Sequence, residues 1–230
     1  MGFDSEAAFF CQQVQARQVR ARRVLAIGCG GADEPSFMAA RLGGTVIGVD
    51  LTLGDRTPRP GVHLVRADAR ALPFRAEVFD AVYCYHVLEH VPGPSRATDE
   101  AARVTKPGGV GLFGTPNKAR VVGYLGGRAT TAEKIRWNLA DYGFRLRRRW
   151  SNEQGAHAGF RLAELDRLVR RSFGSSEPVS QSYYEHKYAN AAPAWRMAFR
   201  IGLAALLAPS VYVIGRRGHG QAPAAGGSRD

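Results

Sequence analysis

The sequence predicts an α/β protein built on a doubly wound, mostly parallel sheet of seven strands. Short apolar runs recur along the first half of the chain and alternate with segments of helical periodicity. A glycine turn, Gly28-Cys29-Gly30, follows the first of these runs directly. With 230 residues and 45% hydrophobic residues, the chain can bury a core of that size.

The first half of the chain defines five expected strands and the helices between them. We expect strands at residues 23–27, 45–49, 62–65, 81–85 and 110–114. Helices are expected at 4–20, 33–42 and 95–105, with a further helix start over 86–91. The run Lys106-Pro107-Gly108-Gly109 ends the helix before the fifth strand. Strands that alternate with helices at this spacing favour a parallel sheet covered on both faces.

The second half is less regular. We expect helices at 132–139, 162–173 and 194–207, a sixth strand at 179–183 and a seventh at 210–215. Residues 1–217 are predicted to form one domain, in which 118–159 and 183–208 are elaborations on the substrate side. The small, polar residues 218–230 are predicted to be a disordered tail.

Charge and cysteine content limit the partners and the compartment. Residues 1–117 carry 13 Lys/Arg and 12 Asp/Glu, whereas residues 118–230 carry 19 and 8. The basic second half favours an anionic small molecule, a membrane surface or nucleic acid as its partner, with general solubility as the alternative. The three cysteines form no CxxC pair, and residues 1–10 lack the features of a signal peptide. We therefore expect a cytoplasmic protein.

The glycine turn is typical of a site for a nucleotide-like ligand. Without a Cβ, Gly28 and Gly30 let a ligand approach the backbone and permit unusual φ values. Asp50 ends the second strand, 20 residues after Gly30, a spacing that suits an acid accepting hydrogen bonds from ribose hydroxyls. For the glycines alone, an ordinary tight turn remains the alternative.

Five segments, taken in order, resemble the class I S-adenosylmethionine-dependent methyltransferases. They are residues 24–30, Asp50, residues 68–74 (Asp68-Ala69 to Leu72-Pro73-Phe74), residues 79–91 and residues 106–109. The resemblance covers roughly residues 20–117 and is closest to the small-molecule and quinone-ring O-methyltransferases, of the methyltransferase type 11 group. It implies a Rossmann-like fold with an antiparallel last strand, and S-adenosylmethionine as the cofactor.

The resemblance also implies roles for single residues. The backbone of Gly28, Cys29 and Gly30 would meet the methionine moiety, and Asp50, with Leu51 beside it, would take the ribose. Asp68 would accept from the adenine amino group, and Ala69 would offer its backbone N–H. Tyr85 would border the sulfonium together with His86.

Two departures from the family pattern bear on activity. The family has an acid where Ala26 stands, which helps to hold the glycine loop and the amino group of the ligand. Its third glycine is Ala32 here. The absent acid motivates one alternative, a catalytically inactive methyltransferase-like module that binds a partner.

His86 and His90 are the candidate catalytic bases, because histidine titrates near neutral pH. Four residues apart, they are expected to share one face of a helix, with Glu89 adjacent, and Glu89 and His90 are expected to cap and orient that helix. Some quinone O-methyltransferases bind a divalent metal through a Glu, Glu, His set here. Since His86 replaces the first Glu, we predict no metal.

The predicted reaction is methyl transfer to oxygen, with nitrogen as the alternative, on a small or lipid-linked acceptor. The basic second half suggests an anionic or amphiphilic acceptor. The Arg cluster at 145 and 147–149, next to Trp150, is the candidate anion contact, with a solvated charged face as the alternative. Residues 194–208 predict either a helix packed on the sheet or a peripheral membrane contact. An RNA methyltransferase is the other alternative, although Cys84-Tyr85-His86-Val87 replaces the Asn/Asp-Pro-Pro-aromatic run of base N-methyltransferases.

Overall fold

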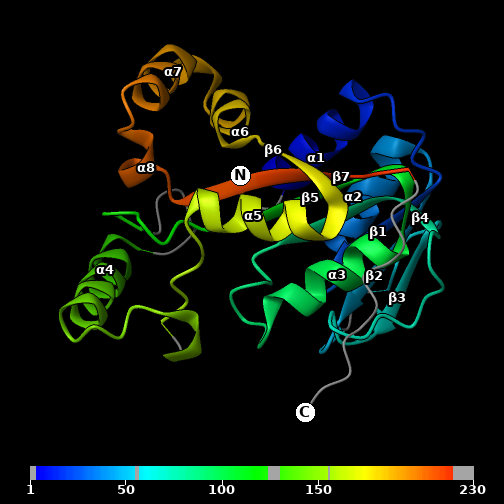
Figure 1. Ribbon diagram of the computed structural model, residues 1–230, viewed down its shortest axis with the longest axis horizontal. Coiled ribbons are helices and arrows are strands. Elements are labelled where there is room, and N and C mark those ends of the chain that lie inside the picture. The colour runs from blue at the N-terminus through cyan, green and yellow to red at the C-terminus, as the bar shows by residue number, and fades with distance from the viewer. Residues whose placement is uncertain (1–3, 55–56, 124–129, 155, 220–230) are drawn as a thin grey trace.

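A single seven-stranded sheet forms the centre of the computed structural model, which describes residues 4–54, 57–123, 130–154 and 156–219. The strand order is β3-β2-β1-β4-β5-β7-β6 (Figure 1). Strands β1 to β5 pair in parallel, and β7 is antiparallel to both of its neighbours. The predicted fold class, including the antiparallel last strand, is confirmed. The strands are β1 (Arg23–Ile27), β2 (Thr45–Asp50), β3 (Val62–Arg66), β4 (Phe79–Tyr85), β5 (Thr105–Pro116), β6 (Gly174–Pro178) and β7 (Ser210–Arg217).

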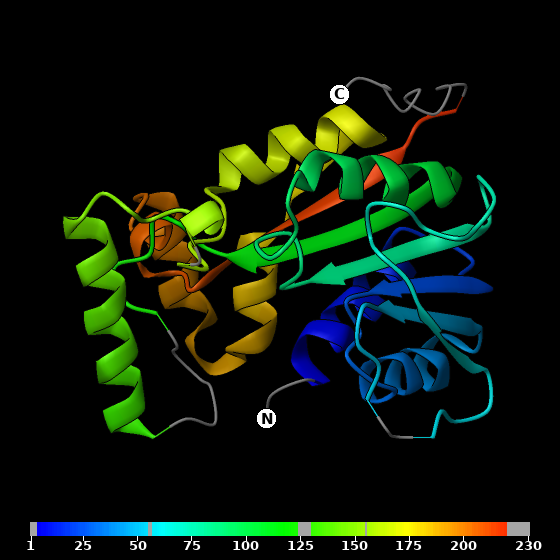
Figure 2. The same cartoon turned by 90° about the horizontal axis from the view of Figure 1, so that it is seen from below.

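Helices cover both faces of this sheet. On one face, α1 (Asp4–Ala16) and α2 (Asp33–Leu42) bury Phe9, Phe10 and Met38 against β1 and β4. On the other, α3 (Pro94–Val104) and α5 (Leu162–Phe173) pack apolar side chains against β4, β5 and β7 (Figure 2). This arrangement buries the apolar runs of the central strands on both sides, as expected for a parallel sheet.

Strand register brings the predicted ligand residues to one edge. Ile27 is level with Val49 on one side and with Cys84 on the other, and Asp50 is level with Arg66. The carboxyl ends of β1 to β4 therefore lie side by side, and the segments that follow them meet there.

The remaining helices lie beyond this carboxyl edge. Figure 2 shows β4 and β5 pointing toward α4 (Thr131–Leu146), α7 (Ala192–Arg200) and α8 (Ala204–Leu207). The connecting elements are α6 (Ser180–Lys187) and two short 3-10 helices, η1 (Asn152–Gln154) and η2 (Ala189–Ala191). Among the helices of the described residues, none combines the length and apolarity needed to cross a membrane.

The sixth strand was predicted in the wrong place. Residues 179–183 begin helix α6, and the strand is β6, directly before them. β6 is an edge strand with sequence GSSEP and no buried residue, so it lacks the apolar signal on which strand prediction relies. Tyr183 and Tyr184 are both buried as successive helical residues, whereas in a strand they would face opposite ways.

Four helix boundaries also differ from the prediction. Helix α1 ends at Ala16 rather than at residue 20, and residues 86–91 form turns, with α3 starting only at Pro94. The predicted helix at 132–139 extends over 131–146. The predicted helix at 194–207 divides into α7 and α8 because Gly202 adopts φ +77°. Of the predicted tail, residues 220–230 lie outside the described residues.

Candidate functional site

The glycine turn makes an open cradle at the carboxyl end of β1. Gly28 and Cys29 donate their backbone N–H groups to the Val49 carbonyl, which ties the turn to β2. Gly28 and Gly30 have φ values of +72° and +60°. A Cβ on Gly28 would lie 2.0 Å from Cγ2 of Val87, whereas a Cβ on Gly30 would meet nothing within 4 Å. The turn thus needs glycine at residue 28 for packing and leaves open space beside residue 30.

The two acids predicted to contact the ligand lie beside this cradle. Asp50 accepts hydrogen bonds from the backbone N–H groups of Gly30 at 2.8 Å and Thr52 at 3.0 Å. Leu51, next to it, is 65% exposed. Asp68 is held by Arg70, whose guanidinium donates to both carboxylate oxygens, with Nη2 2.6 Å from Oδ2. These hydrogen bonds lower the pKa of Asp68.

Ala69, also predicted to contact the ligand, is largely buried and follows Asp68 at the end of β3. The structure therefore gathers Gly28, Cys29, Gly30, Asp50 and the Asp68–Ala69 pair along one edge.

Tyr85 belongs to a buried cluster of aromatic and charged groups beside the turn. Its ring stacks on Tyr212 at 6.0 Å between centroids, and its hydroxyl donates to Glu6 of α1 at 3.4 Å. Glu6 also accepts from the Tyr183 hydroxyl and from Lys187 Nζ at 2.8 Å. Helix α1 is thereby joined to β4 and to α6 at the carboxyl edge of the sheet.

A second cluster contains both candidate bases. His86 follows β4 in a left-handed conformation with φ +54°, and its Nε2 lies 3.4 Å from Ser210 Oγ. Oε1 of Glu89 lies 3.3 Å from His86 Nδ1 and 3.9 Å from His90 Nε2. The rings of His90 and His157 are 4.5 Å apart. His86 and His90 thus both lie near Glu89 on a turn, and they do not share one face of a helix.

Burial sets the electrostatics of this second cluster. The side chain of Glu89 is only 1% exposed, and neither of its oxygens accepts a hydrogen bond from the described residues. Burial raises its pKa to about 7. The expected capping role of Glu89 is therefore wrong. Desolvation lowers the pKa of His86 to about 4, so its imidazole is neutral at neutral pH, although 39% of the side chain still faces solvent.

Within the residues that the structure describes, no three His, Cys, Asp or Glu side chains form a group suited to a metal ion.

The predicted basic cluster divides into an inward and an outward part. Arg145 lies over the ring of Trp150 at 4.5 Å and donates to the Arg120 carbonyl. Buried Arg120 lies on the same ring at 5.0 Å and pairs with Asp141 at 3.0 Å. Residues 147–149 are exposed. Arg145 thus fixes α4 against the segment after β5. Only the arginines at 147–149 form the solvated charged face that was the alternative prediction for this cluster.

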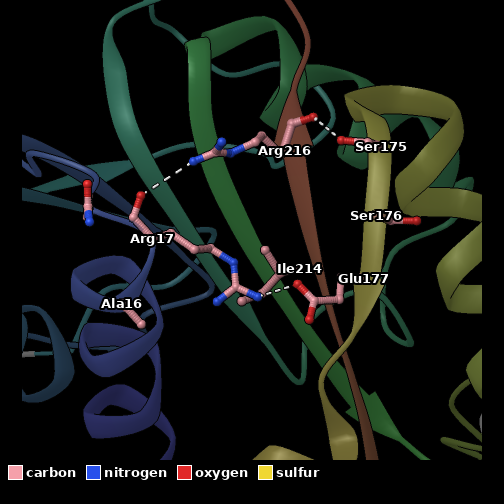
Figure 3. Close-up of a pocket in the computed structure, with 8 residues that line it drawn as sticks. Ala16, Arg17, Ser175, Ser176, Glu177, Ile214 and Arg216 are labelled. Atoms are coloured by element: carbon pink, nitrogen blue, oxygen red, sulfur yellow. Dashed lines mark hydrogen bonds and ion pairs between the residues drawn. The ribbon is translucent and has the colours of Figure 1, made fainter.

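A separate cavity of about 460 Å³ lies at the opposite end of the sheet. Figure 3 shows Arg17 from the end of α1 reaching Glu177 of β6, with a nitrogen–oxygen distance of 2.5 Å. Arg216 beside them is level with Val110, the first residue of β5 that pairs with β7. Ligands of doubly wound folds bind at the carboxyl ends of the strands, so this cavity is not the candidate site.

Sequence reasoning missed several residues of the site. Glu6, Tyr183 and Lys187 come from helices that only tertiary packing brings to this edge. Glu34, in the first turn of α2, accepts from the Tyr83 hydroxyl at 3.2 Å. Its position four residues after Gly30 is a signal that the sequence does contain. His157 offered no such signal.

Comparison with known proteins agrees with this geometry. Residues 25–113 match the family model described as "Methyltransferase domain". This part of the chain is therefore similar to a methyltransferase domain. This matched segment begins in β1 and ends in β5, so it contains the glycine turn, Asp50, Asp68 and the His86–His90 turn.

Curated relatives match over part of their length. The chain is 39% identical over 111 residues to a ubiquinone biosynthesis O-methyltransferase of Paracidovorax citrulli, covering 44% of this chain and 46% of that protein. It thus spans about half the length of the curated relatives that it matches.

Solved structures extend the likeness to the whole fold. The YcgJ protein from Bacillus subtilis superposes with a TM-score of 0.54 at 16% identity, covering 94% of this chain and 99% of that one. Phosphoethanolamine N-methyltransferase 2 of Haemonchus contortus, solved with S-adenosyl-L-methionine, gives 0.52 at 16%, covering 95% and 57%. Both show that the chain shares their Rossmann-like fold.

Proposed function

We propose that this chain transfers the methyl group of S-adenosylmethionine to a hydroxyl oxygen of a small or lipid-linked acceptor. The observation that carries the proposal is the coincidence of the methyltransferase match at residues 25–113 with the edge where the glycine turn, Asp50 and Asp68 meet. The identity of 39% to an O-methyltransferase supports oxygen as the methyl acceptor.

The residues at this edge fit the proposed cofactor. The space beside Gly30 admits a ligand against the backbone. Asp50 ends β2 and Asp68 follows the neighbouring strand β3, and their carboxylates suit ribose hydroxyls and an adenine amino group. The bound cofactor supplies a methyl group on positively charged sulfur. The chain would bind it through the turn of Gly28 to Gly30, through Asp50 with Leu51, and through Asp68 with Ala69.

His86 is the proposed base. Neutral at neutral pH, its ring can take the proton that the acceptor hydroxyl loses. The Glu89 carboxyl, 3.3 Å from Nδ1, would then stabilise the protonated ring and set its orientation. His90, held between Glu89 and His157, would line the acceptor side. The bulk of the rate increase would come from alignment of the acceptor oxygen.

The test is transfer of a labelled methyl group from S-adenosylmethionine to a hydroxylated aromatic ring, with and without a prenyl tail. Labelling of the hydroxyl, lost in His86→Ala but retained in His63→Ala as a histidine remote from the site, supports the proposal. Labelling of RNA in its place would favour the RNA methyltransferase. Tight cofactor binding without transfer to any acceptor would favour the inactive binding module.

A lipid-linked acceptor suggests where the chain meets a membrane. Exposed apolar side chains cover α7, α8 and the turn between them, among them Met197 at 53% and Ile201 at 64% exposure. Arg196 and Arg200 lie on the same short helix. An apolar surface beside basic side chains suits an anionic bilayer interface.

This surface is joined to the carboxyl end of β5. The buried Asn117 side chain, just after β5, donates to the carbonyls of Ala205 and Ala208 at 2.8 Å each. We expect the chain to co-sediment with phosphatidylglycerol vesicles and not with phosphatidylcholine vesicles. Ile201→Ser should weaken this binding, and Ile135→Ser, which alters an exposed apolar residue of α4, should not. Absence of vesicle binding would remove the membrane contact and leave the methyl transfer untouched.

A further inference from the structure

The order of the strands assigns each part of the proposed cofactor to a strand end, and the inference that follows rests on the proposed function. Along the carboxyl edge, Asp68 follows β3, Asp50 ends β2, the glycine turn follows β1, and Tyr85 ends β4. If Asp68 meets adenine and Asp50 meets ribose, the amino-acid end of the cofactor falls at β1 and β4. That end carries an ammonium group, which needs an anionic or carbonyl acceptor.

β1 itself offers no carboxylate for this ammonium group. Its sequence is RVLAI, and Ala26, two residues before the turn, is fully buried. The residue level with Ala26 on β4 is Tyr83, whose large ring is also buried. The ring packs against Phe10 of α1, with centroids 5.3 Å apart. The Tyr83 side chain thus lies beside Ala26, and its hydroxyl points toward α2.

That hydroxyl holds a carboxylate from outside the strand. Tyr83 Oη donates to Oε1 of Glu34 at 3.2 Å, and Glu34 lies in the first turn of α2, four residues after Gly30. The charge of Glu34 acts on the glycine turn. Burial raises the pKa of the Cys29 thiol to about 11, and the negative charges of Asp50 and Glu34 contribute to this rise. Glu34 therefore lies at the β1–β4 edge, on the side of the sheet covered by α1 and α2.

The other nearby acids are less suited to this task. Glu6 accepts from Tyr85 at the end of β4 and from Lys187 of α6, so its contacts join α1 to β4 and α6 rather than to the glycine turn. Asp33 precedes Glu34 in the same helical turn but is exposed. Asp50 already accepts from the backbone N–H groups of Gly30 and Thr52, and it is assigned to the ribose.

We propose that Glu34, held by Tyr83, binds the ammonium group of the methionine moiety of S-adenosylmethionine. It would supply from α2 the carboxylate that β1 lacks at Ala26. The two features belong together, because a longer side chain at residue 26 would compete with the Tyr83 ring for space beside β4. The absent acid would then mark a relocated contact rather than an inactive protein.

The test measures binding rather than turnover. Calorimetry would compare S-adenosylhomocysteine with its deaminated analogue, which lacks only the amino group, on the wild type and on Glu34→Gln. We expect Glu34→Gln to weaken S-adenosylhomocysteine about tenfold and to leave the affinity for the analogue unchanged. Tyr83→Phe, which removes only the hydroxyl that holds Glu34, should act in the same direction by less. Asp33→Asn, the matched change one residue away, should alter neither affinity.

Each other outcome contradicts the inference. If Glu34→Gln weakens both ligands equally, or neither, Glu34 does not recognise the ammonium group. If Asp33→Asn has the same effect as Glu34→Gln, only the general charge of the helix matters. If the wild type binds neither ligand, the proposed function itself fails and the inference fails with it.

Discussion

Substitution of Gly28 by alanine should damage the chain more than the same change at Gly30. Gly28 has φ +72°, and its new Cβ would lie 2.0 Å from Val87 Cγ2, where carbon atoms normally stay about 3.5–4.0 Å apart. The left-handed conformation costs an alanine about 1–2 kcal/mol. Relief of the clash adds about 1–3 kcal/mol. Gly28→Ala should therefore lower the free energy of unfolding by about 2–5 kcal/mol.

The assay is urea denaturation of a set of four variants. Gly30→Ala, with φ +60° and nothing near its Cβ, should lose only the backbone part, about 1–2 kcal/mol. In a double-mutant cycle, Val87→Ala removes the γ-methyl groups, so it should recover about 1–3 kcal/mol when combined with Gly28→Ala. Equal losses in Gly28→Ala and Gly30→Ala, or no coupling to Val87→Ala, would refute the packing of the glycine turn described above.

Three further predictions concern single side chains. Glu89→Gln removes a carboxyl whose pKa is raised by burial from 4.5 to about 7, so the folded wild type binds this proton more tightly than the unfolded chain does. The stability of the wild type relative to Glu89→Gln should therefore fall by about 3 kcal/mol as pH rises from 4.5 through 7. The comparison is repeated in a His86→Ala background, which removes the opposite contribution of His86, whose pKa is lowered to about 4. A flat difference in urea denaturation across this range contradicts the prediction. Asn117→Ala removes two hydrogen bonds to backbone carbonyls and one from the Ala119 N–H. It should lower the free energy of unfolding by about 2–4 kcal/mol in the same assay. A decrease below about 1 kcal/mol would contradict this role of Asn117. Arg70→Ala frees the Asp68 carboxylate and should tighten cofactor binding by up to about fivefold in calorimetry, whereas weaker binding would mean that Arg70 itself contacts the ligand.

The central strands of the sheet are easier to predict from the sequence than the edge strand β6. The inner strands β1, β4 and β5 are predictable because both of their faces are covered, so they appear as apolar runs between glycine, proline and polar turns. β6 carries no apolar signal because it is an exposed edge. Residues 179–183 read as a strand, but packing of Tyr183 and Tyr184 against β7 and α1 makes them helical. Here tertiary contacts override local preference.

Some residues of the candidate site can likewise be predicted from the sequence, and others cannot. Asp50, Asp68 and His86 are predictable because the carboxyl ends of parallel strands meet at one edge. The burial of Glu89 is not predictable, because it depends on turns at 86–91 that the sequence presents as a helix. Glu6 and Glu34 reach the site from helices, and only the packing of α1 and α2 on the sheet determines which acid lies near Tyr83 or Tyr85.

The most direct test of the account is calorimetric titration of the chain with S-adenosylmethionine and, separately, with NADH. Both ligands present ribose and adenine to Asp50 and Asp68, but only one has the methionine moiety that the glycine turn would hold. We predict binding of S-adenosylmethionine, its loss in Asp50→Ala, and no binding of NADH. Binding of NADH, or no binding of S-adenosylmethionine, would contradict the proposal that this edge is the cofactor site of a methyltransferase.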